Sequence, residues 1–276
     1  MTAACVYALF VWWFSTGVVL LLDNLPRRTF RYSMVAGTVV FVLALHRLSA
    51  SSDDVSEAGA WAAFTYAVLA WAWQEMSFFM GYVTGPRLDP APPGCTTWER
   101  FKAGIMACLW HELAIIGTAI VIAAITWGGA NQVGTWTFML LWLMRTSAKL
   151  NVFLGVLNLG EEFLPAHLRY LLSFMARRRM NALMPFSLAG GTIGAVMLAQ
   201  AASDAATAAT AAGLAMLATM TALAVVEHWC LILPLPFARL WGWSLKYKPG
   251  KLKQSGREQG IRDSRRTSHG LPAVLP

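Results

Sequence analysis

Seven long apolar runs follow one another along the chain, separated by shorter polar connections. Each run has about 17 to 25 residues, the length that a helix needs to cross a hydrocarbon core of ~30 Å. Because lipid offers no hydrogen-bond partners to bare backbone, such runs must form helices. We therefore expect an all-α fold, a polytopic bundle of about seven transmembrane helices. The predicted helices span about residues 5–22, 32–48, 59–83, 103–126, 133–157, 183–200 and 210–233.

The chain also divides into a membrane domain and a tail. Residues 1–245 contain all of the predicted membrane helices, whereas residues 246–276 are polar and basic over most of their length. A composition of this kind is typical of a solvated, disordered segment. We expect a seven-helix membrane domain over 1–245, followed by a basic, disordered cytoplasmic tail.

One connection carries a helical pattern of its own. The stretch FLPAHLRYLLSFMARRR, residues 163–179, has leucines at helical spacing and ends with three arginines, which are favourable at a helix C-terminus. It predicts an amphipathic cytoplasmic helix at the membrane interface. Its apolar face would lie either on the membrane surface or against the bundle.

The composition agrees with a membrane protein. Of the 276 residues, 57% are hydrophobic and 13% are charged, whereas soluble domains have roughly 25% charged residues. The net charge of +8 could suggest nucleic acid as a partner. However, nearly every lysine and arginine lies in a short connection or in the tail, as topology signals and contacts with anionic lipids do. We expect the lipid bilayer as a partner, and no nucleic acid.

The same charges predict an orientation. If the N-terminus lies outside, all of the 22 lysines and arginines except Arg47 lie on the cytoplasmic side. The opposite orientation would violate the positive-inside bias. We therefore predict a multi-pass protein of the bacterial inner membrane with a periplasmic N-terminus and a cytoplasmic C-terminus.

Ionisable residues inside the apolar runs are the candidates for chemistry, because intramembrane charges usually face the bundle interior. Glu75, His111 and Glu227 all lie roughly 9–12 Å below the predicted cytoplasmic surface, at ~1.5 Å rise per residue. We expect one polar cluster at this depth if the helices are neighbours. Its members are Glu75, His111, Glu112, Arg145, Lys149, Glu227 and His228, and further candidates at the cytoplasmic edge are Glu161, Glu162 and His167.

Several interpretations of this cluster remain open. In the first, Arg145 and Lys149 neutralise two of the three glutamates in an ion-pair network that fixes the bundle. In the second, the cluster binds a metal such as iron, as carboxylates and imidazoles do in helical di-iron proteins, although their Glu-x-x-His spacing is missing here. A third is a pocket for bacteriochlorophyll or a precursor with an imidazole as axial ligand, and a fourth is a proton or ion pathway. The possible metal ligands are Glu75, His111, Glu112, Glu227 and His228.

The middle of the chain carries a family resemblance. The stretches WHELAIIG, NQVGTWTFMLLWLMRTSAKLNVFLGVLNLGEEFLPAHLRYLLSF and MNALMPFS place polar residues inside apolar runs, where chance agreement is rare. Over about residues 73–192 the chain resembles the PuhE-type photosynthetic complex assembly proteins of purple phototrophic bacteria. The resemblance implies a multi-helix membrane protein that is encoded with the reaction-centre H subunit and assembly genes. It supplies no catalytic residues.

Together these observations favour a non-enzymatic assembly factor in the inner, intracytoplasmic membrane. We expect it to act on the reaction centre and light-harvesting complex or to adjust bacteriochlorophyll supply. Its expected partners are reaction-centre or light-harvesting subunits, or pigment-biosynthesis proteins. The alternative from another class is a membrane di-iron oxidoreductase that acts on a hydrophobic pigment precursor.

Overall fold

The computed structural model describes residues 1–233 and 237–245, so the expected tail at 246–276 lies outside the described residues. In the described part the regular structure is helical, apart from one isolated β-bridge between Val156 and Arg177. The expected all-α fold is confirmed. The long helices are α1 (Thr2–Asp23), α2 (Arg27–Ala50), α3 (Glu57–Phe79), α4 (Thr97–Ile125), α5 (Val133–Leu154), α6 (Met184–Ser203) and α7 (Ala208–Ile232), and the short ones are η1 (Ala166–Phe174), η2 (Phe237–Trp241) and α8 (Gly242–Leu245).

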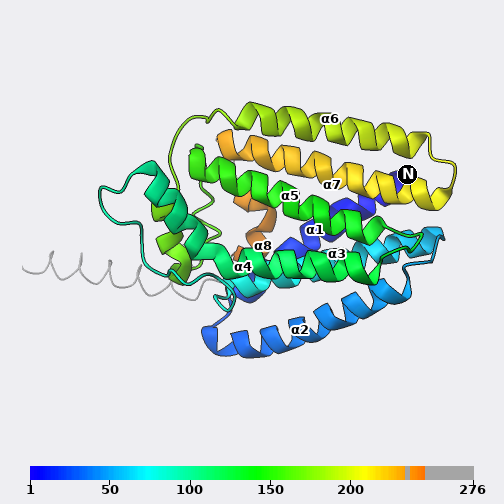
Figure 1. The fold of residues 1–276 in the computed structure, drawn as a ribbon, viewed down its shortest axis with the longest axis horizontal. Helices are drawn as coiled ribbons and strands as arrows, with labels where there is room; N and C mark the ends of the chain where they lie inside the picture. The colour runs from blue at the N-terminus through cyan, green and yellow to red at the C-terminus, as the bar shows by residue number, and fades with distance from the viewer. Residues whose placement is uncertain (234–236, 246–276) are drawn as a thin grey trace, which may run out of the picture.

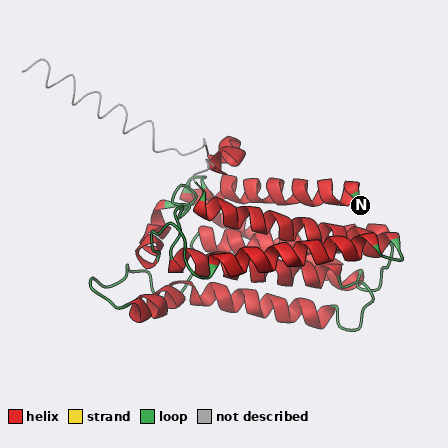
Figure 2. Ribbon diagram, turned by 90° about the horizontal axis from the view of Figure 1, so that it is seen from above, coloured by secondary structure: helices red, strands yellow, loops and turns green. Residues whose placement is uncertain are grey.

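The long helices lie side by side along one direction (Figure 1 and Figure 2). The N-terminus lies at the same end as the α2–α3, α4–α5 and α6–α7 connections. The α1–α2, α3–α4 and α5–α6 connections lie at the opposite end, which we call the basic end because arginines gather in its connections and in the adjoining helix starts. Helix α3 contacts α1, α2, α4, α5 and α7 and is therefore the central helix of the bundle.

Five of the long helices, α1, α2, α4, α6 and α7, are long and apolar enough to cross a membrane. The other two, α3 and α5, have a comparable length but are less apolar, and they carry Glu75, Arg145 and Lys149. All seven predicted helices are therefore present, and five of them qualify as membrane spans by their own composition. On α2, Val35, Val39 and Leu43 are exposed, as expected of a helix face in contact with lipid.

Small residues bring α1, α3 and α7 close together. Ala8 of α1, Ala60 of α3 and Ala215 of α7 are buried in one apolar cluster around Phe64 and Met216. Small side chains at helix interfaces let the backbones approach closely, which is the usual way in which membrane helices associate.

Helix α4 begins earlier than predicted and is kinked. It begins at Thr97 rather than near residue 103, because Thr96 and Glu99 form a capping box at its N-terminus. At Cys108 the backbone leaves helical geometry (φ −127°, ψ 15°). Beyond this kink the N–H of His111 donates to the carbonyl oxygen of Thr84, at 2.9 Å, so the α3–α4 connection supplies the acceptor.

The helix expected over 163–179 is shorter, and its apolar face lies against the bundle. It forms only the three-ten helix η1, Ala166–Phe174. Leu168, Leu171 and Phe174 are buried against Ala103 and Ala107 of α4 in a common cluster. Of the two expected positions for this apolar face, the structure therefore shows the one against the bundle.

Candidate functional site

Two ion pairs join α5 to its neighbours. The guanidinium Nη2 of Arg145 lies 3.0 Å from Oε2 of Glu75 on α3, and the Nζ of Lys149 lies 2.5 Å from Oε1 of Glu112 on α4. The first interpretation of the polar cluster requires pairs of this kind. Both are partly shielded from the surroundings, with side-chain exposures of 35% and 15% for Arg145 and Glu75.

Helix α5 also makes the neutral polar contacts of the bundle. The Oγ of Ser147 lies 2.9 Å from Nε2 of His228 on α7 and 3.0 Å from the hydroxyl oxygen of Ser187 on α6. The side-chain amide of Asn151 donates to the same Ser187 oxygen at 2.9 Å. Arg145, Ser147, Lys149 and Asn151 therefore connect α5 to α3, α7, α4 and α6, and we call these four residues the α5 hub.

The contacts of His228 determine which ring nitrogen holds its proton. Its Nδ1 lies 2.7 Å from the carbonyl oxygen of Ala224, one turn earlier on α7. A carbonyl oxygen can only accept a hydrogen bond, so Nδ1 carries a proton. The ring is fixed on both sides, by α7 itself and by Ser147 of α5.

His111 occupies a different environment. Its side chain is 0% exposed, and neither ring nitrogen has a hydrogen-bond partner. The ring packs against the Phe78 ring of α3, with centroids 4.6 Å apart. The charges of Lys149 and Arg145 act on it from α5. His111 is therefore a buried imidazole that packs against an apolar ring.

The His-Glu pair of α4 and the Glu-His pair of α7, both members of the expected polar cluster, make separate hydrogen bonds and ion pairs. Helix α5 contacts both α4 and α7 (Figure 1). Its Lys149 pairs with Glu112 of α4, whereas its Ser147 contacts His228 of α7. Trp110 and Trp229 are exposed on the outside of the bundle. Glu227 accepts a hydrogen bond of 3.1 Å from Nε1 of Trp12 on α1, and it lies close enough to Arg145 and Glu75 for their charges to interact.

The possible metal ligands form no ligand set in the described part of the chain. Among the residues that the structure describes, no three His, Cys, Asp or Glu side chains come close enough to hold a metal ion. Glu75 and Glu112 each face a cation of α5, and His228 faces a serine. The geometry therefore gives no support to the di-iron interpretation.

Two buried polar residues were not predicted. Asp23, at the end of α1, is 6% exposed, and neither of its carboxylate oxygens has a hydrogen-bond partner. It lies close enough to Glu75 for their charges to interact. Gln74 is fully buried and donates to Thr118 of α4 at 2.7 Å. The burial of Asp23 could not be predicted, because Asp23 stands at the start of a polar connection. The only sequence signal for Gln74 was a single glutamine within an apolar run.

The residues at the predicted cytoplasmic edge lie in the α5–α6 connection. Glu161 forms an exposed ion pair with Arg177, and Glu162 is its neighbour in the chain. His167 lies in the first turn of η1 and lines a small pocket with Gly81. Burial lowers the pKa of His167 below its ordinary value of 6.5, and the positive charge of Arg27 lowers it further.

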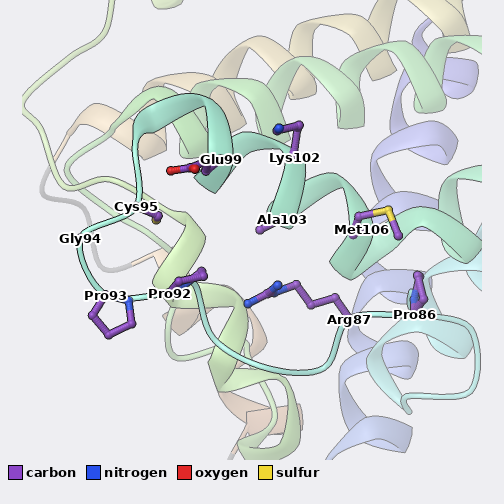
Figure 3. A pocket seen from close by; sticks show the side chains of 10 residues that line it. All are labelled: Pro86, Arg87, Pro92, Pro93, Gly94, Cys95, Glu99, Lys102, Ala103 and Met106. Atoms are coloured by element: carbon purple, nitrogen blue, oxygen red, sulfur yellow. The ribbon is translucent and has the colours of Figure 1, made fainter.

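A cavity of about 670 Å³ lies within the α3–α4 connection and the first turns of α4 (Figure 3). Its polar side chains serve mainly to shape the connection. Arg87 donates to the carbonyl oxygens of Asp89 and Pro90, and Glu99 belongs to the capping box of α4. The complete lining is Pro86, Arg87, Pro92, Pro93, Gly94, Cys95, Glu99, Lys102, Ala103 and Met106.

A protein family and a known protein resemble this chain over most of its length. A family model described as a protein of unknown function, DUF3623, matches residues 1–251. The chain is 40% identical over 241 residues to an uncharacterized 30.4 kDa protein in the puhA 5′ region of Rhodobacter capsulatus, a match that covers 86% of this chain and 88% of that relative. No solved structure matches the chain. Because the family model extends over nearly all of the described residues, the chain belongs to the DUF3623 family.

Proposed function

We propose that this chain is a membrane-embedded assembly factor for the photosynthetic reaction centre and light-harvesting complex. The similar protein of Rhodobacter capsulatus is encoded beside puhA, and the family resemblance implies a gene setting with the reaction-centre H subunit. Both point to the same process. The expected location is the inner, intracytoplasmic membrane.

The observation that carries the proposal is the α5 hub. Inside the bundle, the charged groups of α3, α4 and α5 contact one another across helix interfaces. Such contacts hold helices in fixed relative positions. A rigid bundle with apolar outer faces suits a protein that receives nascent membrane subunits on its surface. Exposed apolar side chains on α2 and α6 provide such faces.

The proposal includes an orientation. The basic end carries Arg27 and Arg28 at the start of α2, and Arg87 and the run 177–179 in its connections. The positive-inside bias favours the cytoplasm for this end and the periplasm for the N-terminus. Proteins that engage this end of the bundle would then be cytoplasmic or would have cytoplasmic segments.

A deletion strain of a phototrophic host tests the function. We expect the absorption bands of assembled reaction centre and light-harvesting complex to fall, and wild-type chain supplied in trans should restore them. A chain with Arg145→Gln and Lys149→Gln should restore them less well than one with Arg28→Gln, when both are present at equal levels in the membrane. Unchanged spectra in the deletion strain would refute the proposal.

The same strain separates assembly from pigment supply. If the chain acts in assembly, extractable bacteriochlorophyll precursors remain or accumulate while complex-bound pigment falls. If it instead adjusts pigment supply, total bacteriochlorophyll falls in proportion to the complexes. Pigment extraction beside membrane absorption spectra distinguishes the two.

A further inference from the structure

A second pocket, of about 300 Å³, lies at the basic end of the bundle. Three parts of the chain that are distant in sequence form it, namely the start of α2, the turn that follows α3, and η1. It is separate from the α5 hub. The lining residues are Arg27, Phe30, Met80, Gly81, Tyr82 and His167.

His167 presents an unoccupied hydrogen-bond acceptor in this pocket. The backbone of Phe79 lies beside its ring. The Nε2 atom is buried and has no partner. A neutral imidazole carries one N–H and one lone pair, and we assign the lone pair to Nε2, the nitrogen without a partner. An acceptor that is shielded from water without a donor is costly, so a donor from a ligand would stabilise it.

The turn after α3 lies directly beside this nitrogen, and its glycine leaves the ring uncrowded. Gly81 has a positive φ of 82°, and a Cβ atom built on it would lie 3.1 Å from Nε2 of His167. A side chain here would therefore be strained and would also crowd the imidazole. Phe30 and Met80, both buried, form the apolar part of the wall.

Arg27 adds a positive charge to the same pocket. Its side chain lines the pocket, and its charge acts on His167. Arg28, the next residue, is exposed but does not belong to the lining. The pocket therefore combines a cation that can hold an anion with a neutral acceptor that needs a donor. A guanidinium pairs well with phosphate oxygens.

The position indicates where such a ligand would come from. Helices α1 and α2 are both candidate membrane spans, and the short turn between Asp23 and Arg27 joins them beside the pocket. This turn lies at the level where a bilayer places its headgroups. We propose that the pocket binds a phosphate that carries a neighbouring hydroxyl, the chemistry of a glycerol-phosphate headgroup. Arg27 holds the phosphate, and the hydroxyl donates to Nε2 of His167.

This assignment discriminates among headgroups. A choline headgroup has no N–H or O–H to donate. An ethanolamine headgroup has donors, but its ammonium would lie beside the like charge of Arg27. The hydroxyl of a glycerol headgroup satisfies His167 without adding a charge. We therefore expect phosphatidylglycerol to bind in preference to the other two lipids.

Native mass spectrometry of the full-length protein, released from mixed micelles of defined lipid, tests the proposal. Phosphatidylglycerol should be retained at least about tenfold more strongly than phosphatidylcholine, the difference expected when one buried, unpaired acceptor gains a donor. Arg27→Gln and His167→Phe should each lower retention of phosphatidylglycerol by a similar factor. Equal retention of the three lipids by the wild-type chain would overturn the proposal.

Arg28→Gln is the matched control, because it removes an equal charge from the adjacent position. We expect its retention of phosphatidylglycerol to stay within about twofold of the wild type, as for a surface charge that contacts no ligand. An equal loss in Arg28→Gln and Arg27→Gln would indicate general attraction to the basic end and would reject the pocket. Thermal unfolding of each variant identifies misfolded protein, and Arg27→Gln changes only an exposed side chain.

Glycerol 3-phosphate distinguishes a lipid from a soluble source. If the headgroup chemistry is right and the source is the bilayer, the free compound should compete only weakly, because it lacks the acyl chains that keep a lipid at the pocket. Competition at micromolar concentrations would support the phosphate-and-hydroxyl chemistry and reject the lipid as its source. Retention of phosphatidylglycerol that depends on neither Arg27 nor His167 would reject both.

Discussion

Single side chains on α5 determine whether buried charges are compensated. Arg145→Gln leaves Glu75 without its cation in a site that is largely shielded, so we expect a loss of about 1–3 kcal/mol in the free energy of unfolding. The double variant with Glu75→Gln should lose less than the sum of the single variants. Reversible unfolding in mixed micelles, followed by circular dichroism, measures this double-mutant cycle.

The pair between Arg177 and Glu161 is the control for that cycle. Its side chains are 65% and 48% exposed, so water screens their interaction. We expect Arg177→Gln to cost less than about 1 kcal/mol. An equal loss for both arginines would show that the position inside the bundle does not strengthen the Arg145 pair.

His167 predicts a pH dependence with a definite sign. Its pKa in the folded protein lies below the ordinary value of 6.5, chiefly because of burial. The folded state therefore binds the proton less readily than the unfolded state. The stability that the neutral ring contributes is complete above pH 6.5 and decreases as the pH falls toward the lower, folded-state pKa.

Thermal unfolding at pH 7.5 and pH 5.5 measures this effect in lipid-free detergent. The wild-type chain should lose more stability between the two values than His167→Phe does, since the variant has no imidazole to protonate. Other acidic groups titrate equally in both proteins, so the difference isolates His167. An identical decrease in both proteins would contradict the assignment.

At the scale of elements, the kink of α4 depends on a loop that fits into it. A Cβ atom on Gly85 would lie 2.1 Å from the carbonyl oxygen of Met106 and 2.6 Å from the carbonyl carbon of Ala107. Gly85→Ala must therefore displace the loop, and we expect a loss of about 1–3 kcal/mol, as for overpacking. The amide of His111, which donates to Thr84, should exchange its hydrogen faster.

Gly117 provides the comparison within the same helix. A Cβ atom on it meets nothing within 4 Å. Gly117→Ala should be neutral or stabilising by up to about 1 kcal/mol, because alanine is the better helix former. Hydrogen exchange at His111 should not change. Faster exchange in both variants would mean that the loop contact is not what protects this amide.

The helices could be predicted from the sequence to within a few residues, because apolar length is a property of each run. The run at 133–157 became α5, Val133–Leu154, which ends before Gly155 with its positive φ of 125°. The earlier start of α4 could have been predicted from the capping box of Thr96 and Glu99. The pairing of charged side chains between helices could not be predicted, because it depends on which helices are neighbours. The sequence identifies Glu75 and Arg145, but only the packing of α3 on α5 shows that they meet.

At the scale of the whole molecule, orientation is the open prediction, and Cys95 is a natural probe for it. Cys95 lies in the α3–α4 connection at the basic end. In a chain that keeps only this cysteine, a membrane-impermeant maleimide should label inverted vesicles but not spheroplasts. A chain with Ala205→Cys as its sole cysteine, in the α6–α7 connection, should show the reverse. Labelling of Cys95 in intact spheroplasts would invert the proposed topology.

The division of the bundle into apolar and charged helices has a consequence for biosynthesis. Helices α3 and α5 fall short of the apolarity of the other five, yet each carries the partner of the other's charge. A central charged residue costs about 2.5–3.5 kcal/mol at insertion. We expect α3 to remain beside the translocon until α5 emerges, and the two then enter lipid together. Nascent chains halted before α5 should leave α3 extractable by alkali, whereas chains halted after it should not. Stable insertion of α3 in both would show that it enters the bilayer without help.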